Sequence, residues 1–457
     1  MVEEYIALVC SWIWGWPMIV LLLGTHLFLT VRLRFPQRRL FTAIRLSVRP
    51  DKKGRGDVTP FGALSTALAA TIGTGNIIGV ATAVALGGPG AVFWCWLTGV
   101  LGFSTKYAEA LLAVKYRVVT SDGTMAGGPM YVLEKGLGLK WLAVLFAIFT
   151  AIAALGIGNT VQANSIATLM NESFGVAPAI TGAGLALLTA LVILFGIGAI
   201  ARFCSYMVPF MAGVYVLGCL AILVLNSQFL PETFSAIFLS AFSAKAFGSG
   251  LVGASVLSAI RYGVARGLFS NEAGLGSAPI VAAAAQTRNP VRQALVSATG
   301  TFWDTVVVCA LTGLVLVSSV IAHPDIDYSQ GAILTKLAFD KIPVLGSPLL
   351  LFGLLTFTFS TILGWSYYGE KAIEYLGGKR VIVLYRWIWI GCVFLGAVAN
   401  LQMIWNLADI MNGLMAIPNL VALLLLSKVA SAETDRYLWG GRLGSYDNNG
   451  PVQQPLP

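Results

Sequence analysis

The feature that most constrains this chain is an uncharged apolar stretch, residues 59–86, that is long enough to cross a bilayer but carries glycines in its middle. Gly73 and Gly75 lie two residues apart and are followed by Asn76. Glycine destabilises a helix interior by up to ~1 kcal/mol, so this pair predicts local unwinding. Unwound backbone at membrane depth is tolerated only where it faces protein or a watery cavity. There its free amides and carbonyls hold anionic groups and cations in many transporters.

A second stretch of the same kind, residues 273–283, decides between two interpretations of the first. Small residues also let membrane helices approach closely, which alone would explain the glycines. However, Gly274 and Gly276 stand 201 residues after the first pair, and a Phe-Trp pair follows each stretch. Interrupted spans in corresponding halves of a membrane protein are the sequence pattern of a transporter binding site.

Composition places the chain in a membrane. It is 57% hydrophobic and 11% charged, with a mean hydropathy of +0.81, whereas a soluble chain carries about 25% charged residues. The net charge of +9 comes from basic residues gathered in short loops, a pattern that orients membrane proteins and does not indicate nucleic acid. The six cysteines lack metal or disulfide spacing, and with two histidines we expect no histidine metal centre.

Apolar segments predict an all-α polytopic protein with eleven spans. They lie at about residues 12–31, 59–86, 91–114, 141–170, 178–199, 204–226, 249–285, 293–321, 347–369, 383–400 and 404–427. Outside them we expect a basic amphipathic segment at 32–58, a loop with Arg202, an outer amphipathic helix at 231–248 and a tail at 429–457 that is disordered from Gly440 onward.

The basic residues orient these spans. Of the 29 Lys and Arg, 24 fall on one side of the membrane and three on the other, while Arg261 and Arg266 lie within a span. This excess places the N-terminus outside and the C-terminus in the cytoplasm. It also makes the two interrupted spans run in opposite directions, as an inverted repeat requires.

Amide side chains lie inside the span predicted at 141–170. Asn159, Gln162 and Asn164 occupy its outer half, where each requires a partner. Hydrogen bonds between helices explain all three, but we expect Gln162 to contact a ligand.

Charged side chains within spans raise the same question. Lys106 and Glu109 fall three residues apart on one helical face, which predicts an ion pair. Glu272 at membrane depth is expected to pair with Arg266 or with a helix N-terminus. Asp304 lies inside the span at 293–321 and receives no assigned role.

Long motifs along nearly the whole chain resemble the alanine or glycine:cation symporter family. They are ATIGTGN at 70–76, GGPGAVFWCW at 87–96, AGGPMY at 126–131, FSNEAGLGSAP at 269–279 and GWSYYGEK at 364–371. Cys95 departs from the family, which usually has Met there. The resemblance implies a LeuT-type fold with a 5+5 inverted repeat, formed by residues 59–230 and 249–428, and one additional N-terminal span within residues 1–31.

The resemblance also implies binding sites by position. The substrate carboxylate would meet the first break and the amino group the second, with further side chains closing the pocket; these residues are Thr74, Gly75, Asn76, Gln162, Phe269, Ser270, Leu275 and Trp365. A sodium site would join the first break to the span at 347–369 through Ala69, Ile72, Phe357, Ser360 and Thr361. A second sodium near Thr71, Asn76 and Ser270 is an additional alternative.

The function implied is sodium symport of a small neutral amino acid by alternating access in the cell membrane. The expected substrate is alanine or glycine, and D-alanine is included as a further candidate. Leu275 and Trp365 would limit substrate size, and we expect no charged side chain in the pocket. A proton-coupled carrier of the same fold is the alternative and would need a titratable group at the cation site. We do not expect an enzyme, since the spans lack a catalytic constellation, and we do not expect a channel. Besides membrane lipid we expect no cofactor, no nucleic acid and no obligate protein partner.

Overall fold

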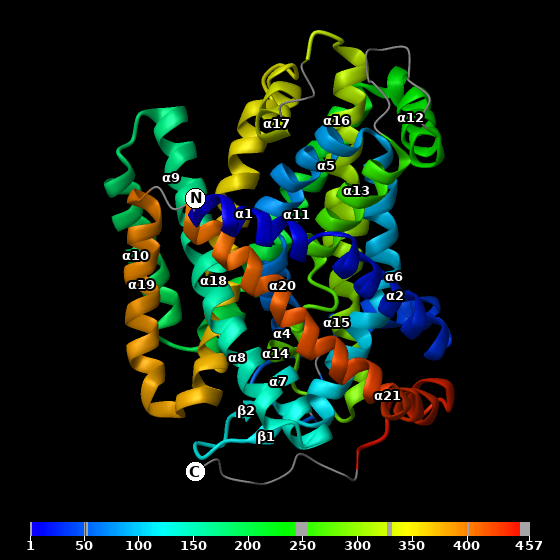
Figure 1. Cartoon of the computed structure of the whole chain (residues 1–457), viewed down its shortest axis with the longest axis vertical. Coiled ribbons are helices and arrows are strands. Elements are labelled where there is room, and N and C mark those ends of the chain that lie inside the picture. The colour runs from blue at the N-terminus through cyan, green and yellow to red at the C-terminus, as the bar shows by residue number, and fades with distance from the viewer. Residues whose placement is uncertain are drawn as a thin grey trace.

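A computed structural model describes residues 2–49, 51, 54–243, 255–326, 331–399 and 402–447, which form a bundle of helices (Figure 1). The first half comprises α1 (Val2–Ile13), α2 (Trp16–Arg32), α3 (Leu40–Ser47), α4 (Pro60–Thr71), α5 (Val80–Gly87), α6 (Gly90–Lys115), β1 (Val118–Val119), β2 (Met125–Ala126), α7 (Pro129–Tyr131), α8 (Lys140–Leu155), α9 (Val161–Phe174), α10 (Pro178–Ile193), α11 (Ile197–Leu225) and α12 (Leu230–Phe242). The second half comprises α13 (Val256–Asn271), α14 (Ala278–Ala282), α15 (Pro290–Thr301), α16 (Ala310–Ala322), α17 (Gly331–Asp340), α18 (Gly346–Gly377), α19 (Ile382–Val398), α20 (Gln402–Leu425) and α21 (Ser427–Thr434).

Among these described residues, seven helical stretches are long and apolar enough to cross a membrane, or eight when one bent pair counts as a span. The seven are Leu8–Arg32, Lys140–Phe174, Ile197–Leu225, Pro290–Ala322, Gly346–Gly377, Lys379–Val398 and Trp405–Leu425. A helical membrane protein is therefore confirmed. The count of eleven spans and the two five-span repeats stay predictions.

Three features of the helices and the tail differ from the sequence prediction. Arg202 lies inside α11, because the preceding turn is already made at Gly196, whose φ is +75°. The helix α17 lies in a segment for which we predicted no helix. The tail remains ordered past Gly440, since the Asn289 amide donates to the carbonyls of Leu443 and Ser445. Residues 448–457, the rest of the tail predicted to be disordered, lie outside the described residues.

The first predicted break is present. Thr59 caps α4 by accepting a hydrogen bond from the amide of Gly62, and Pro60 begins the helix. The helix ends where Ile72 turns to an extended ψ of 95°. A π-helical turn at Gly75–Gly79 then leads into α5, and the two halves are bent by 56°.

The second predicted break separates α13 from α14 by the six residues 272–277. Gly274 and Gly276 adopt φ angles of +93° and +86°, which only glycine enters without strain. Glu272 also adopts a positive φ, +55°, although it has a side chain. At this break, the backbone conformation therefore requires glycine at the two positions whose spacing predicted unwinding.

The two broken elements lie against each other in opposite directions. Helix α5 packs on α13, and α4 packs on α14. In Figure 1, α5 and α13 point toward the end of the molecule that carries α12 and α17, whereas α4 and α14 lie toward the end that carries β1 and β2. Both breaks consequently meet in the middle of the bundle.

Candidate functional site

A small cavity of about 20 Å³ lies where the two breaks meet. It is lined by Ala70, Thr71, Gly73, Thr74, Gly75, Ile157, Gln162, Phe269, Ser270, Glu272, Thr361, Trp365 and Asn412. Six of the predicted substrate residues are in this set, namely Thr74, Gly75, Gln162, Phe269, Ser270 and Trp365. The volume suits about one water molecule, so an amino acid would enter only as the lining side chains shift outward.

The three amides of the fourth predicted span have different environments. Asn159 donates to the carbonyl of Trp389 at 2.9 Å, and Asn164 donates to the carbonyls of Gly396 and Ala399 at 3.2 Å. These two amides therefore join α9 and the turn before it to α19, as the helix-packing alternative predicted. The Nε2 atom of Gln162 donates to Ile157, but its Oε1 atom is buried and lacks a hydrogen-bond partner within the described part of the chain. Gln162 thus offers the cavity a free acceptor.

Asn76 and Leu275 lie outside the set that lines the cavity. Asn76 accepts a hydrogen bond from the amide of Gly73 at 2.9 Å and donates to Asp304 at 2.7 Å. It therefore stabilises the first break without lining the cavity. Leu275 is fully buried. Their contact with substrate stays a prediction.

Sequence reasoning missed two polar side chains that line the cavity, those of Glu272 and Asn412. The Asn412 Oδ1 atom is buried and, among described residues, has no hydrogen-bond partner. Glu272 brings a carboxylate to the cavity, so the expectation of a pocket without a charged side chain is wrong. Its place inside the second break was the available signal, whereas nothing in the sequence distinguishes Asn412 from other amides in spans.

The five oxygens predicted to bind sodium are gathered at one point. The Ser360 hydroxyl lies 3.3 Å from the carbonyl oxygen of Ala69, and the Thr361 hydroxyl lies 3.3 Å from that of Ile72. Both hydroxyls lie 2.9 Å from the carbonyl oxygen of Phe357. Because Ile72 ends α4, its carbonyl lacks a partner in its own helix and is free to turn toward α18.

The alternative second sodium site is centred on Asp304. Its carboxylate accepts hydrogen bonds from Asn76 at 2.7 Å, from Ser270 at 2.9 Å and from Thr305 at 2.7 Å. Two of the three expected ligands are therefore together, while the Thr71 hydroxyl bonds to the carbonyl of Leu68 in its own helix. Asp304, which had no assigned role, joins the two breaks.

Two of the predicted partnerships of the other buried charges, Lys106 with Glu109 and Glu272 with Arg266, are wrong. Lys106 donates to the carbonyl of Asn271 at 2.5 Å, and Glu109 accepts from Asn419 and from the freed amides of Gly274 and Gly276. Lys106 and Glu109 thus each stabilise the second break and form no direct ion pair within the described residues. The partner of Glu272 is the hydroxyl of Ser277, the N-cap residue of α14. Of its two predicted partners, Arg266 is therefore wrong, whereas the helix N-terminus agrees with the structure.

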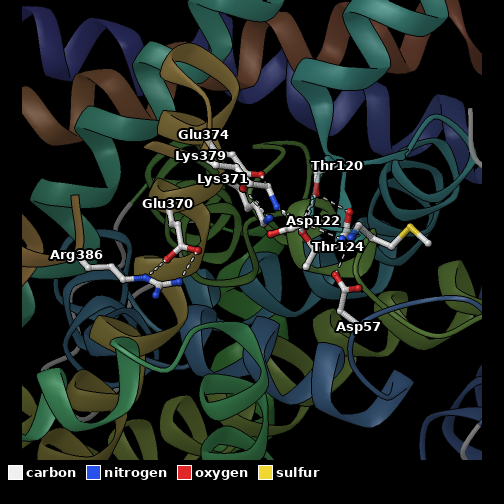
Figure 2. A network of polar contacts seen from close by, with 10 residues as sticks. Asp57, Thr120, Asp122, Thr124, Glu370, Lys371, Glu374, Lys379 and Arg386 are labelled. Carbon is white, nitrogen blue, oxygen red and sulfur yellow. Dashed lines mark hydrogen bonds and ion pairs between the residues drawn. The ribbon is translucent and has the colours of Figure 1, made fainter. Parts of the chain in front are cut away.

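A polar network ties the β1–β2 hairpin to the end of α18 (Figure 2). Lys379 pairs with Asp122 in the hairpin turn, and the amide of Met125 donates to Asp57 at 2.8 Å. Partial burial alone would raise the pKa of Asp122, but hydrogen bonds from Lys379 and Thr124 hold it well below its usual range. Burial raises the pKa of Asp57. Asp122 therefore meets Lys379 as an ionised carboxylate.

Arg117 connects the segment that follows α14 to the same region. It donates to the carbonyls of Ala283 and Ala285, which follow α14, at 3.0 and 2.9 Å. Burial lowers the pKa of Arg117 to about 10, and the charge of Asp57 opposes that shift. The guanidinium therefore remains charged and holds the segment that follows α14.

Known proteins provide an independent comparison. Residues 1–448 match the sodium:alanine symporter family. The sodium/alanine symporter AgcS of Methanococcus maripaludis is 55% identical over 435 residues, covering 93% of this chain and 95% of that protein. An uncharacterised transporter of Haemophilus influenzae is 51% identical, covering 98% and 99%. The crystal structure of MhsT in complex with L-phenylalanine superposes with a TM-score of 0.58 at 15% identity, covering 85% of this chain and 96% of that one, and so shares the fold.

Proposed function

Because this chain belongs to the sodium:alanine symporter family, we propose that it imports a small neutral amino acid across the cell membrane by sodium symport with alternating access. It is an integral membrane transporter and not an enzyme. Alanine is the proposed substrate, with glycine and D-alanine in the proposed range. The observation that carries the proposal is the junction of the two breaks, where backbone amides, carbonyls and free acceptors surround one cavity.

Sodium coupling is supported by the chemistry of the oxygens between α4 and α18. Two hydroxyls and three carbonyls, from Ala69, Ile72, Phe357, Ser360 and Thr361, give a set of hard neutral oxygens. Such oxygens suit an alkali cation and carry no titratable group, which disfavours the proton-coupled alternative. Since the oxygens belong to two helices, a bound ion would hold α18 against the first break.

Amino-acid recognition is supported by groups of opposite polarity around the cavity. The unwound backbone at Thr74 and Gly75 presents helix-terminal amides, which favour a carboxylate. Three acceptors also belong to residues that line the cavity: the free oxygens of Gln162, beside Gly73 of the first break, and of Asn412, and the carboxylate of Glu272 in the second break. A zwitterion has charges that match both kinds of group, and Trp365 leaves room for only a small side chain.

Replacing Gln162 with alanine is expected to weaken alanine binding by ~1–3 kcal/mol, because the substrate loses one buried hydrogen-bond acceptor. Titration calorimetry on purified protein measures the change. Asn164→Ala is the matched control, since that amide bonds only to backbone of α19 and the residue after it. Equal alanine affinity in wild type and the Gln162 variant would remove Gln162 from the site.

The 24-to-3 charge excess leads us to propose an outside N-terminus and a cytoplasmic basic segment. A cysteine at Arg45, which is exposed on α3, is expected to resist an impermeant thiol reagent added to intact cells. A cysteine at Ser173, exposed at the opposite end of the bundle, is the control and is expected to react. Both are tested after replacement of the native cysteines. The reverse labelling pattern would invert the topology.

A further inference from the structure

Glu272 is the only charged side chain among the described residues that line the cavity. The residue is only 4% exposed, so its carboxylate has given up most of its hydration. One carboxylate oxygen accepts a hydrogen bond from Ser277 within the same break, and the Trp365 side chain also acts on the carboxylate, but both groups are neutral. A desolvated carboxylate at membrane depth requires a positive counterpart, which a hydroxyl does not supply.

The cation that acts on Glu272 is hydrogen-bonded to another group. Lys106, close enough to interact electrostatically with Glu272, donates to the backbone carbonyl of Asn271. The carboxylate of Asp304, which repels that of Glu272, is occupied by donors from Asn76, Ser270 and Thr305. In the part of the chain that the structure describes, Glu272 has no ion-pair partner within 4.0 Å.

The backbone of Glu272 adds a second observation. Its φ of +55° places a residue with a side chain in the left-handed region, a conformation that strains any residue except glycine. The two neighbouring left-handed positions, 274 and 276, are both occupied by glycine, the residue that adopts this conformation without strain. Glu272 is therefore the exception in this turn. A strained residue that carries a charge into a cavity indicates a functional side chain.

From this geometry we infer that Glu272 is the counter-ion of the substrate's ammonium group and determines specificity for amino acids over other small carboxylates. The assignment rests on the proposed function and deepens it. The ammonium would face Glu272 and the free oxygens of Gln162 and Asn412, three acceptors that converge on one cavity. A 2-hydroxy acid of the same shape brings a hydroxyl in place of the cation, and so leaves the carboxylate without its counterpart.

The test compares alanine with lactate, its hydroxy-acid analogue, by calorimetric binding to purified protein in saturating sodium. Wild type is expected to prefer alanine by at least about 100-fold, because the buried carboxylate goes unpaired with lactate. Glu272→Gln is expected to lose about 10- to 100-fold in alanine affinity and to lose most of that preference, since its amide accepts equally from a hydroxyl.

Glu109→Gln is the matched control, because it removes a buried carboxylate that bonds to the same break but does not line the cavity. Its preference for alanine over lactate is expected to remain that of wild type. An unchanged preference in Glu272→Gln would overturn the assignment while leaving the transporter proposal intact. If instead wild type bound no alanine, the proposed function itself would fail.

Folding of each variant is checked by size-exclusion chromatography. Should Glu272→Gln not fold, Glu272→Asp keeps the charge while shortening its reach. That variant is expected to bind alanine more weakly yet still reject lactate. A Glu272→Asp protein that accepted both ligands equally would also overturn the assignment.

Discussion

Replacing Gly75 with valine is expected to abolish measurable alanine binding, with a loss of at least ~100-fold, or ~2.7 kcal/mol. A Cβ atom at this position would lie 3.5 Å from the Phe269 ring and 3.7 Å from the Cα of Ser270, which are ordinary contacts. The fold therefore tolerates the first carbon. The two valine methyl groups extend further, into a cavity of only about 20 Å³ where the substrate carboxylate is proposed to meet the backbone.

Graded variants separate loss of the site from loss of the fold. Gly75→Ala is expected to fold normally and to retain part of the affinity, because its Cβ clears both neighbours. Gly184→Val on α10 is the control for the same chemical change, since a Cβ there meets nothing within 4 Å. If Gly75→Val bound alanine normally, the glycines would serve helix packing alone and the first break would not be a binding site.

Removing the hydroxyls of α18 is expected to weaken the response to sodium. Thr361→Val preserves shape but deletes one of five oxygens, so the sodium concentration at half-maximal uptake is expected to rise about 10-fold. Ser360→Ala deletes a second oxygen and is expected to act similarly. The two hydroxyls approach different carbonyls of the first break, Ile72 and Ala69. The double variant is consequently expected to lose nearly all sodium dependence.

A neighbouring threonine provides the control for this series. Thr358 is also buried on α18, but its hydroxyl donates to the carbonyl of Leu354 in its own helix. Thr358→Val is therefore expected to leave the sodium requirement unchanged. Uptake of labelled alanine by whole cells across a sodium series measures the sodium concentration at half-maximal uptake for all four variants. A double variant with wild-type sodium dependence would mean that the coupling ion binds elsewhere.

Sequence patterns predicted the two breaks because backbone chemistry is local. Two glycines in the middle of an apolar span weaken the helix locally in any fold, and the positive φ angles of Gly274 and Gly276 show why those positions exclude other residues. The pairing of Ser360 and Thr361 with Ala69 and Ile72 is not local. It followed from the resemblance to a family of known fold, since 291 residues separate Ser360 from Ala69 and 289 separate Thr361 from Ile72.

The errors arose where a broken helix offers partners that a continuous helix lacks. Spacing along α6 predicted that Lys106 and Glu109 pair with each other, but the break at 272–277 presents free amides and a carbonyl that compete for both. The direction of the Glu272 side chain depends on its positive φ, which no residue pattern specifies. Asn412 lines the cavity only because α20 packs beside the breaks, a tertiary relation without a sequence signal.

The central claim is that sodium at the first break and alanine in the adjoining cavity stabilise each other. Linkage requires that if sodium raises the affinity for alanine, alanine raises the affinity for sodium by the same factor. The most direct measurement is alanine binding to purified protein across a sodium titration at fixed ionic strength, repeated at two pH values. Affinity is predicted to rise with sodium equally at both pH values, since hydroxyls and carbonyls do not titrate there. Binding that ignored sodium and followed pH would contradict the account and favour the proton-coupled alternative.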